Sequence, residues 1–336
     1  MNPEKGKVRA LGLTSGGLDS ILAALVLRRQ RIAVEWVAFE TPFFSADKAR
    51  KAARMIAVPL TVRPITEVYL KMLKNPPVGY GRCMNPCMDC HALMFRLAGE
   101  LMREKGADFL FSGEVVGQRP MSQTRQSLRY VEKHSGFDGY ILRPLSAQRL
   151  PETIPEKEGW VERTQLLGIS GRGRKEQIQL ARAYGVTDYP APAGGCLLTD
   201  KHYARRLRDL FAHRDQPAER ELELLKYGRH FRLSPDTKVV VGRSQAENEA
   251  MLRWCDPAVD FQVKIRDYAS PLALMPHGGK PEAVLLAATI CASYSKAPKI
   301  VRMVEAEVTR PGGREVLSVI ALPPSDFRRL LILGSR

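Results

Sequence analysis

The stretch VRALGLTSGGLDSILAALVLRRQ, residues 8–30, decides the fold of the first half of this chain. The apolar run at its start predicts a buried strand, and the apolar spacing of LDSILAALVLRRQ predicts a helix. Between them, SGGLDS can turn sharply at its two glycines, so that backbone N–H groups face one anion at the helix N-terminus. The alternative is an ordinary turn in which the Asp of this loop only caps the helix. The order strand, loop and helix predicts a phosphate-binding loop made by Ser15, Gly16, Gly17, Asp19 and Ser20.

Short apolar runs alternate with segments of helical spacing as far as residue 185, which indicates a parallel sheet covered by helices. Beyond the opening strand and helix, we expect strands at 32–40, 60–66, 107–114 and 139–145. We expect helices at 45–57, 67–75, 92–106 and 175–185, and a connecting segment rich in Pro and Gly at 145–173. The predicted fold class is α/β, a Rossmann-like parallel sheet with helices on both faces, followed by a smaller α+β domain at the C-terminal end.

The chain carries 52 Lys and Arg against 36 Asp and Glu, a formal net charge of +16. Of these residues, 23 basic and 16 acidic ones follow residue 200, so the excess is spread along the chain and is not a basic tail. Such a charge favours polyanionic partners, above all nucleic acid. The alternative is a protein that is basic only for solubility.

The sequence shows no sign of a membrane protein. It has no run of about 18 apolar residues, and its start, MNPEKGKVRALGLTS, lacks a secretory signal pattern. We therefore expect a soluble cytoplasmic protein without a membrane partner. Cysteines stay reduced in that compartment, where groups of them indicate metal binding or catalysis.

A second polar motif ends the strand predicted at 107–114. Ser112, Gly113 and Glu114 stand at its C-terminal end, and open α/β sheets bind their ligands at that edge. Gln118 follows in the next loop, where its amide suits a phosphate or base contact. The alternative is an ordinary polar loop between a strand and a helix.

The SGGLDS loop resembles the S-G-G-x-D-S PP-loop of the ATP pyrophosphatase superfamily, and the Walker sequence G-x-x-x-x-G-K-[ST] is absent. The resemblance implies that ATP, with Mg²⁺ near Asp19, is cleaved between its α and β phosphates. The loop would hold the pyrophosphate while AMP passes to a substrate oxygen, which then becomes a leaving group. The resemblance also implies ATP contacts from Ser112, Gly113, Glu114 and Gln118.

The segments GEVVGQ (113–118) and RPL (143–145) are similar to the G-E-x-x-G-Q and R-P-L segments of the tRNA 4-thiouridine synthetases. The resemblance covers about residues 8–200 and implies ATP-dependent thiolation of a tRNA uridine. Only 14 residues precede Ser15, and no rhodanese-like loop is evident. We therefore expect RNA docking and sulfur delivery to differ from those synthetases.

Three of the six cysteines lie in GRCMNPCMDCH, residues 81–91. Cys87 and Cys90 form a C-x-x-C pair that enters a helix, whose dipole favours thiolates, and Cys196 stands in the Gly-rich turn PAGGCLL. The residues leave four interpretations open. These are a zinc site that adds Cys83, a persulfide-carrying thiol pair, an iron–sulfur cluster on Cys87, Cys90 and Cys196, and incidental cysteines.

The segments NPCMDCH and PAGGCLLTD resemble those of a bacterial PP-loop group. A C-x-x-C pair with one distant cysteine is also similar to PP-loop tRNA thiolases that hold a [4Fe–4S] cluster. This resemblance implies metal ligation by Cys87, Cys90 and Cys196, with Cys83 as an additional ligand or a bystander. It implies the catalytic set Asp19, Cys87, Cys90 and Cys196, with sulfide or a persulfide carrier as sulfur donor. Zn²⁺ is the alternative to the cluster.

The last part of the chain begins with the strand-like TKVVVG, and PEAVLLAATICASYSKA (281–297) predicts a buried helix that starts at a proline. These segments resemble the RNA-binding domain of the NFACT proteins, which implies tRNA as a partner. The alternative is a structural or dimerising domain. Cys255 and Cys291 lie in apolar surroundings here and are expected to be buried.

The predicted organisation is a PP-loop ATP-binding catalytic domain at 1–200, a helical connection at 201–230 and an NFACT-like RNA-binding domain at 231–336. The predicted function is ATP-dependent tRNA uridine thiolation, in which a uridine carbonyl oxygen is adenylated and sulfur transfer uses a [4Fe–4S] cluster. Two hypotheses compete with it: another PP-loop nucleotide ligase or amidating enzyme with a zinc site, and a non-catalytic RNA-binding factor with a vestigial nucleotide fold. The sequence does not indicate the uridine position, the choice between C2 and C4, or the oligomeric state.

Overall fold

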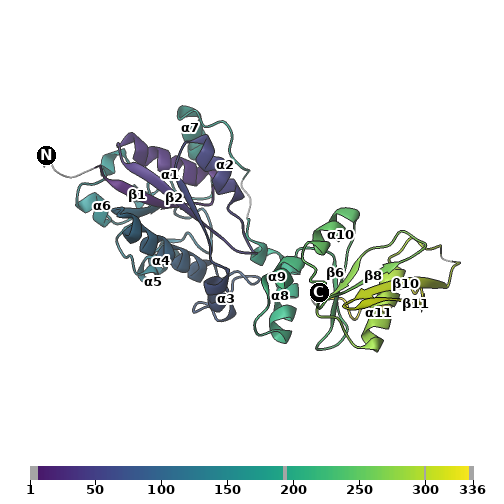
Figure 1. The fold of residues 1–336 in the computed structure, drawn as a ribbon. Helices are drawn as coiled ribbons and strands as arrows, with labels where there is room; N and C mark the ends of the chain where they lie inside the picture. Colours follow the sequence, from purple (N-terminus) through teal and green to yellow (C-terminus); the bar gives the residue numbers. More distant parts are fainter. Residues whose placement is uncertain (1–6, 192–194, 299, 333–336) are drawn as a thin grey trace. The chain divides into compact units, whose positions relative to one another are not determined.

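The computed structural model describes residues 7–191, 195–298 and 300–332 (Figure 1). The chain divides into two compact units, Met1–Thr199 and Asp200–Arg336, and each has a sheet of its own. We call them the N-terminal unit and the C-terminal unit. The first three residues of PAGGCLLTD lie outside the described residues.

The sheet of the N-terminal unit has five strands in the order β3-β2-β1-β4-β5, and each neighbouring pair is parallel. The strands follow the apolar runs of the sequence, and the central β1 and β4 are almost wholly buried. Their bounds are β1 (Arg9–Leu13), β2 (Ala33–Glu40), β3 (Leu60–Pro64), β4 (Phe109–Ser112) and β5 (Ile141–Leu142). The predicted parallel α/β fold is confirmed.

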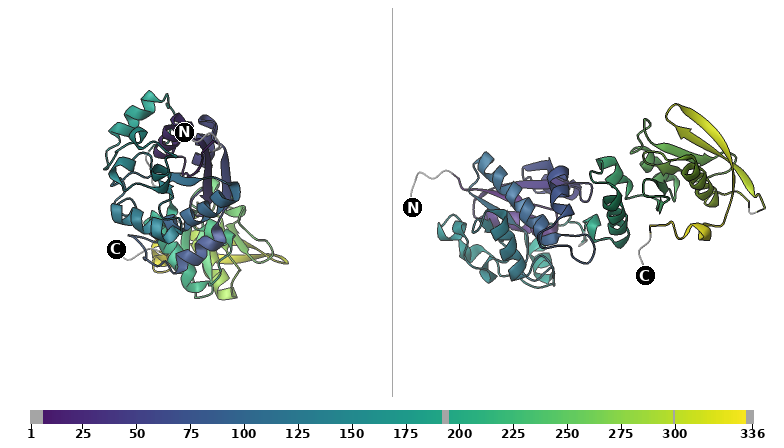
Figure 2. Two further views of the ribbon diagram at one scale, coloured as in Figure 1. Left: turned by 90° about the vertical axis from the view of Figure 1, so that its left-hand side faces the viewer. Right: turned by 90° about the horizontal axis from the view of Figure 1, so that it is seen from below.

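Helices cover both faces of this sheet, as the views in Figures 1 and 2 show. One face carries α1 (Leu18–Arg29), α2 (Asp47–Met55) and α7 (Lys175–Ala183), and the other carries α3 (Thr66–Lys74), α4 (Cys87–Lys105) and α5 (Arg125–Ser135). The main core lies between α1 and the sheet, where Leu22 and Leu27 join Trp36, Phe109 and Phe111. Each fully buried side chain of this size contributes about 1.5–3 kcal/mol relative to its exposure to water.

Helix α4 begins at Cys87, although the sequence predicted its start at Ala92. The backbone N–H of Cys90 donates to the carbonyl of Pro86 at 2.8 Å and closes a first helical turn around the C-x-x-C pair. The helix ends as predicted, at Gly106, which takes the left-handed conformation with φ +62°. The two cysteines of the pair therefore lie on the first turn of a long helix.

Strand β5 covers two residues of the seven predicted at 139–145. Gly139 turns the chain with φ +77°, and Pro144 has no N–H to donate to a ladder, so pairing stops on both sides. The connecting segment predicted at 145–173 contains the short helix α6 (Ile154–Lys157) and two 3₁₀ turns.

The C-terminal unit contains an antiparallel sheet of six strands in the order β11-β10-β8-β9-β7-β6. The strands are β6 (Arg229–Arg232), β7 (Lys238–Val241), β8 (Phe261–Ile265), β9 (Ala273–Met275), β10 (Met303–Arg310) and β11 (Gly313–Ile320). The helices are α8 (Lys201–His213), α9 (Glu219–Leu224), α10 (Gln245–Leu252) and α11 (Pro281–Ser293). The apolar α11 packs on the sheet, so the predicted α+β domain is confirmed.

The two cysteines of the C-terminal unit differ in burial. Cys291 of α11 is fully buried, as predicted. Cys255 is only partly buried, and its Sγ accepts a hydrogen bond from Gln262 Nε2 at 3.4 Å, so the prediction of a buried apolar residue is wrong there. Among the described residues, no helix combines the length and apolarity needed to cross a bilayer.

Candidate nucleotide and thiol site

The C-terminal ends of β1 and β4 lie side by side at the centre of the N-terminal sheet. The strand order runs outward from β1 through β2 to β3 on one side, and through β4 to β5 on the other. This reversal of direction is the topological switch point at which open α/β sheets bind nucleotides. The SGGLDS loop follows β1, and Ser112 ends β4, so the two predicted motifs flank this point.

The SGGLDS loop has the backbone of a phosphate cradle. Gly16 has φ +73°, and a Cβ there would lie 2.2 Å from the carbonyl carbon of Lys48, so only glycine fits. Its N–H donates to Thr14 Oγ1 at 3.0 Å. Gly17 caps α1, and a Cβ there would meet only Ser15 Oγ at 3.7 Å. The space above Gly17 is therefore open for a phosphate group to approach the helix N-terminus.

Asp19 lies at the centre of this edge. Its Oδ2 accepts a hydrogen bond from Gln118 Nε2 at 2.9 Å, and its Oδ1 is buried without a hydrogen-bond partner. Burial raises the pKa of the Asp19 carboxyl, and Gln118, Arg174 and Arg119 partly oppose this effect. An unpartnered carboxylate oxygen beside a phosphate cradle suits Mg²⁺, which takes one or two protein carboxylates together with phosphate oxygens.

Arg174 is a functional candidate that the sequence analysis missed. It caps α7, its Nε is buried without a partner, and its charge acts on Asp19. The preceding residues run beside the loop after β4, because Ser170 bridges Val116 in parallel and Gly171 N–H donates to the carbonyl of Val116 at 2.7 Å. The sequence signal is SGRGRK (170–175), an alternation of Gly and Arg that spans the end of the connecting segment predicted at 145–173 and the start of the next helix.

Gly113 holds the second motif against the phosphate loop. A Cβ at this position would lie 2.4 Å from the carbonyl carbon of Asp19 and 2.4 Å from the backbone nitrogen of Ser20. Only a glycine allows the backbone after β4 to approach α1 this closely. Ser112 is buried, and its hydroxyl donates to Glu114 Oε2 at 3.1 Å.

Glu114 has internal partners on both sides. Its Oε1 lies 2.8 Å from His91 Nδ1, its Oε2 accepts from Arg143 Nε at 3.0 Å, and the buried Arg143 also pairs with Glu132. Burial opposes ionisation of Glu114, but Arg143 and His91 outweigh it and lower the pKa to about 2. This carboxylate therefore joins the start of α4 to the end of β4, a link that the sequence analysis did not foresee.

We expect Glu114→Gln to lower the free energy of unfolding by about 3 kcal/mol at pH 7, because a buried guanidinium loses a charged partner. Folding lowers the pKa of Glu114 from 4.5 to about 2. The stabilisation is therefore complete above pH 4.5 and is lost as the pH falls toward 2. Urea denaturation at pH 7 and at about pH 3.5 measures the difference between the two proteins, which should shrink at the lower pH. A difference that stays constant would contradict this role of Glu114.

The three thiols assigned to metal binding gather at the start of α4. Burial raises the pKa of the Cys90 thiol, with further contributions from Cys196 and Cys87. Burial also raises the pKa of Cys196 to about 11, and Cys87 again contributes. The three thiols are therefore close enough for a charge on one to disfavour a charge on another. The Tyr69 hydroxyl acts in the opposite direction and lowers the pKa of the Cys90 thiol.

Backbone contacts bring Cys196 to this place from more than a hundred residues away. Met84 N–H donates to the carbonyl of Leu198 at 3.1 Å, and Leu197 N–H donates to the carbonyl of Phe43 at 3.1 Å. The turn that carries Cys196 is thus fixed to the cysteine loop and to the loop after β2.

Cys87 and Cys83 have different surroundings. The Cys87 Sγ accepts from Asn85 Nδ2 at 3.2 Å, and the side chain is partly exposed. Cys83 is buried, and its backbone N–H donates to Asn85 Oδ1 at 3.2 Å. The Asn85 side chain therefore forms hydrogen bonds with both Cys83 and Cys87. These bonds fix the turn that leads into α4.

The donor set fits a thiolate-bound metal group. Within the described parts of the chain, no group of three or more His, Cys, Asp or Glu side chains is placed so that it could hold a metal ion. The three thiols are neighbours, and an iron–sulfur cluster or Zn²⁺ would bind them as thiolates and draw them together. His91 and Glu114 join this cluster to the end of β4, and Gly113 joins that strand end to the phosphate loop. The thiols and the phosphate loop therefore share one edge of the sheet.

Two protein families match separate parts of the chain. Residues 5–149 match the family described as thiamine biosynthesis protein (ThiI), and residues 228–329 match the family described as NFACT protein RNA binding domain. The chain joins a ThiI-type PP-loop domain to an NFACT-type RNA-binding domain. The ThiI-type match identifies residues 5–149 as a nucleotide-utilising PP-loop domain. The resemblances to the 4-thiouridine-synthetase-type PP-loop domain and to the NFACT RNA-binding domain are confirmed over the matched residues. The NFACT-type domain contains all six strands of the C-terminal sheet.

Three solved structures are similar to the chain at low identity. A predicted subunit of tRNA methyltransferase from Methanocaldococcus jannaschii has 14% identity and a TM-score of 0.34, with 52% of this chain and 76% of that chain covered. The C-terminal part of the fibronectin/fibrinogen-binding protein from Streptococcus suis has 12% identity and a TM-score of 0.27, with 79% and 98% covered. NMN synthetase from Francisella tularensis has 11% identity and a TM-score of 0.27, with 56% and 90% covered. All three TM-scores are low, so these similarities carry no argument about the ThiI-type domain.

Proposed function

We propose that the protein is an ATP-dependent tRNA uridine thiolase of the cytoplasm. The observation that carries the proposal is the shared edge of the N-terminal unit, where three thiols at the start of α4 join the phosphate loop through His91, Glu114 and Gly113. The RNA-binding domain in the same chain supports a tRNA substrate. A nucleotide site, a thiol site and an RNA-binding domain are the three parts that such a reaction needs.

The phosphate loop acts in the first step. The uridine carbonyl oxygen attacks the α phosphorus of ATP, and pyrophosphate leaves into the cradle formed by Ser15, Gly16, Gly17 and Ser20. Asp19 would hold Mg²⁺, with Gln118 orienting its carboxylate, and Arg174 would offset phosphate charge. Ser112 and Gly113 shape the wall opposite the loop.

The thiols act in the second step, in which sulfur bonds to the activated uridine carbon and the oxygen leaves with AMP. Cys87, Cys90 and Cys196 would hold a [4Fe–4S] cluster, which supplies an iron atom without a protein ligand as a Lewis acid when it is bound. The Asn85 and Tyr69 contacts orient two of these thiols. Sulfide or a persulfide carrier supplies the sulfur. A Zn²⁺ site that adds Cys83 is the alternative occupant.

We place the tRNA-binding function in residues 231–336, with 201–230 as the helical connection formed by α8 and α9. A chain that ends at Thr199 is expected to keep the ATP affinity of the full chain and to lose tRNA binding. The affinity of the full chain should fall by roughly a thousandfold between 50 and 200 mM salt, because phosphate contacts supply most of it. Isothermal titration with ATP and fluorescence anisotropy with labelled tRNA measure both. Unchanged tRNA affinity in the shortened chain would contradict this division of roles.

The nucleosides of tRNA from cells with and without the gene test the proposed function. Mass spectrometry should find one thiolated uridine that disappears with the gene and returns with it. An amidated or ligated nucleoside in its place would favour another PP-loop reaction. Unchanged nucleosides would favour an RNA-binding factor without catalysis.

A further inference from the structure

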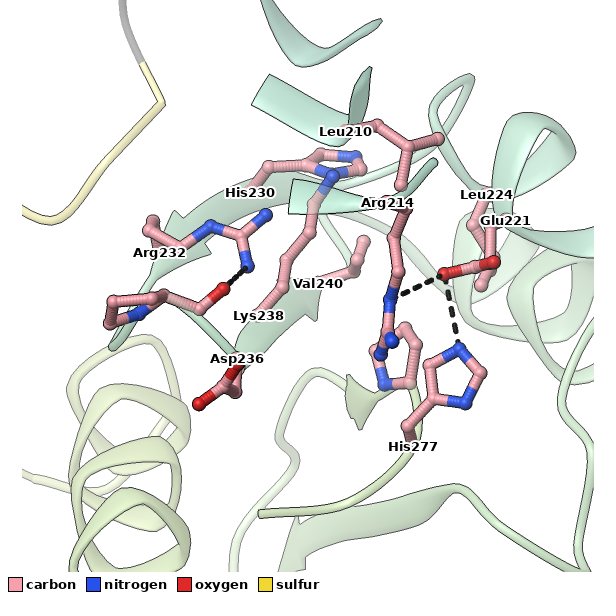
Figure 3. A pocket seen from close by; sticks show the side chains of 12 residues that line it. Leu210, Arg214, Glu221, Leu224, His230, Arg232, Asp236, Lys238, Val240 and His277 are labelled. Atoms are coloured by element: carbon pink, nitrogen blue, oxygen red, sulfur yellow. Dashed lines mark hydrogen bonds and ion pairs between the residues drawn. The ribbon is translucent and has the colours of Figure 1, made fainter. Parts of the chain in front are cut away.

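A cavity in the C-terminal unit lies where α8 and α9 meet β6 and β7, and Figure 3 shows the side chains that line it. Its volume is about 30 Å³, room for about two water-sized atoms. The lining residues Asp236 and His277 are exposed and mark the mouth, while His230 and Lys238 are buried and form the floor. The cavity is therefore a narrow opening from the surface onto two titratable side chains.

The floor contains polar groups whose hydrogen bonds are not satisfied. Lys238 is 8% exposed, and its ion pair with Asp209 Oδ2 spans 3.8 Å, beyond hydrogen-bond distance. His230 is 2% exposed, its Nε2–H donates to the carbonyl of Tyr227 at 2.7 Å, and its Nδ1 has no partner. Figure 3 shows Lys238 reaching from β7 toward the imidazole of His230 on β6. Lys238 Nζ carries three N–H donors and has one long ion pair, so a ligand in the cavity could accept hydrogen bonds from it.

The carboxylates around the cavity are already engaged. Asp209 accepts two hydrogen bonds from Arg232, at 3.1 and 2.5 Å. Glu221 bonds His277 Nε2 at 3.1 Å and lies 3.7 Å from Arg214. Asp236 is exposed at the mouth. Of these acids, Asp209 is the one that forms an ion pair with the Lys238 ammonium, at 3.8 Å.

Positive charge prevails at the floor. Burial lowers the pKa of His230, and the charges of Lys238, Arg206 and Arg243 lower it further. Burial lowers the pKa of Lys238 to about 8; Asp209 and Glu221 oppose this shift, while Arg232 and Arg206 add to it. An anion in the cavity would offset these charges.

The mouth is built with a strained residue. His277 has φ +65°, a left-handed conformation that is rare outside glycine, and its N–H donates to Asp260 Oδ1 at 2.9 Å. The next residue, Gly278, also has φ +67°, and a Cβ there would lie 2.7 Å from the Phe261 ring. The chain thus holds the His277 imidazole at the rim in a conformation that costs free energy, as is common at binding sites.

We propose that this cavity binds one phosphate group of an RNA, with Lys238 as the donor at the floor and Arg214 and Arg232 at the mouth. The inference extends the proposed tRNA binding and rests on it. Two non-bridging oxygen atoms of one phosphate match the size of the cavity. His230 Nδ1, which has no hydrogen-bond partner, would donate to the phosphate once the anion favours its protonation. The site would hold one RNA phosphate at a defined position, in addition to the general attraction of the basic surface for RNA.

The test compares Lys238→Met in the full chain with Lys264→Met, which removes one exposed positive charge of β8. Fluorescence anisotropy with labelled tRNA should show about a tenfold loss of affinity in the first variant and a small loss in the second. The slope of log affinity against log salt should fall by about one for Lys238→Met. Its free energy of unfolding should change little, because Asp209 keeps its two hydrogen bonds from Arg232 when Lys238 is replaced. A purely structural lysine would give lower stability and unchanged affinity.

Two further measurements complete the test. Inorganic phosphate should raise the melting temperature of the wild type more than that of Lys238→Met. If Lys238→Met does not fold, Lys238→Gln takes its place in both measurements. RNA oligomers with and without a 5′ phosphate identify the source: equal affinity supports a backbone phosphate, and tighter binding of the phosphorylated oligomer supports a terminal one.

Affinity equal in Lys238→Met and Lys264→Met overturns the proposal and assigns the cavity to ordered water. Thiolation of cellular tRNA is measured separately. Failure of the cavity site would therefore leave the proposed thiolase function in place, and absence of thiolation would leave the affinity comparison valid.

Discussion

Cys90→Ser is expected to abolish tRNA thiolation, with more than about a 100-fold loss, while ATP binding and cooperative unfolding remain. Cys90 is partly buried at the first turn of α4, where Cys87, Cys196 and the Tyr69 hydroxyl all act on the pKa of its thiol. A serine cannot bind iron as a thiolate does, so the cluster would be lost or made labile. Anaerobic purification with an absorption spectrum and iron and sulfide assays measures the cluster. Mass spectrometry of tRNA nucleosides measures the activity.

The controls come from the other cysteines. Cys87→Ser and Cys196→Ser should behave as Cys90→Ser does. Cys255→Ser, in the C-terminal unit, should keep both cluster and activity, and we expect the same of Cys83→Ser. Full activity and iron content in Cys196→Ser would contradict the three-thiol site. One zinc per chain, lost on Cys83→Ser, would favour the four-cysteine zinc site.

Gly113→Ala is expected to weaken ATP binding by roughly 10- to 100-fold, the effect of about 1–3 kcal/mol of overpacking. The new Cβ would lie 2.4 Å from the backbone of Asp19 and Ser20 and would push the strand end away from the phosphate loop. Gly173→Ala is the matched control, because a Cβ there meets no atom within 4 Å. Isothermal titration with ATP and Mg²⁺ measures the affinity. Equal affinities in the two variants would contradict the close approach of the strand end to the loop.

Gly17→Ala tests the phosphate contact of the loop without the overpacking that Gly113→Ala introduces. Its Cβ would meet only Ser15 Oγ at 3.7 Å, and Gly17 has φ −76°, which alanine adopts freely. The free energy of unfolding should therefore change little, whereas ATP affinity should fall because the methyl group occupies the phosphate approach. Unchanged ATP affinity would show that the cradle lies elsewhere.

The parts of the fold that depend on local pattern could be predicted from the sequence. Each strand of the N-terminal sheet follows an apolar run, and the SGGLDS loop lies between β1 and α1, as its glycines and their neighbours require. The bounds of two elements were wrong. Strand β5 is short because Gly139 and Pro144 end its pairing, and α4 begins at Cys87 because Cys90 closes a turn onto Pro86.

The candidate site, too, could be predicted from the sequence only in part. Its residue types were identified from motifs, but their partners depend on long-range packing. Glu114 bonds a histidine 23 positions earlier and an arginine 29 positions later, which no local pattern encodes. The charge of Arg174, which directly follows the predicted connecting segment, acts on Asp19. The approach of Cys196 to Cys90 depends on backbone hydrogen bonds between three separate loops.

The most direct test of the central claim is a single-turnover reaction with the anaerobically purified protein. Its substrates are ATP, Mg²⁺, sulfide and tRNA from cells that lack the gene, and nucleosides and nucleotides are quantified together. The account predicts one thiolated uridine for each AMP and each pyrophosphate formed, and none of the three with Asp19→Asn. ADP and phosphate as products, or thiolated uridine formed without ATP, would contradict it.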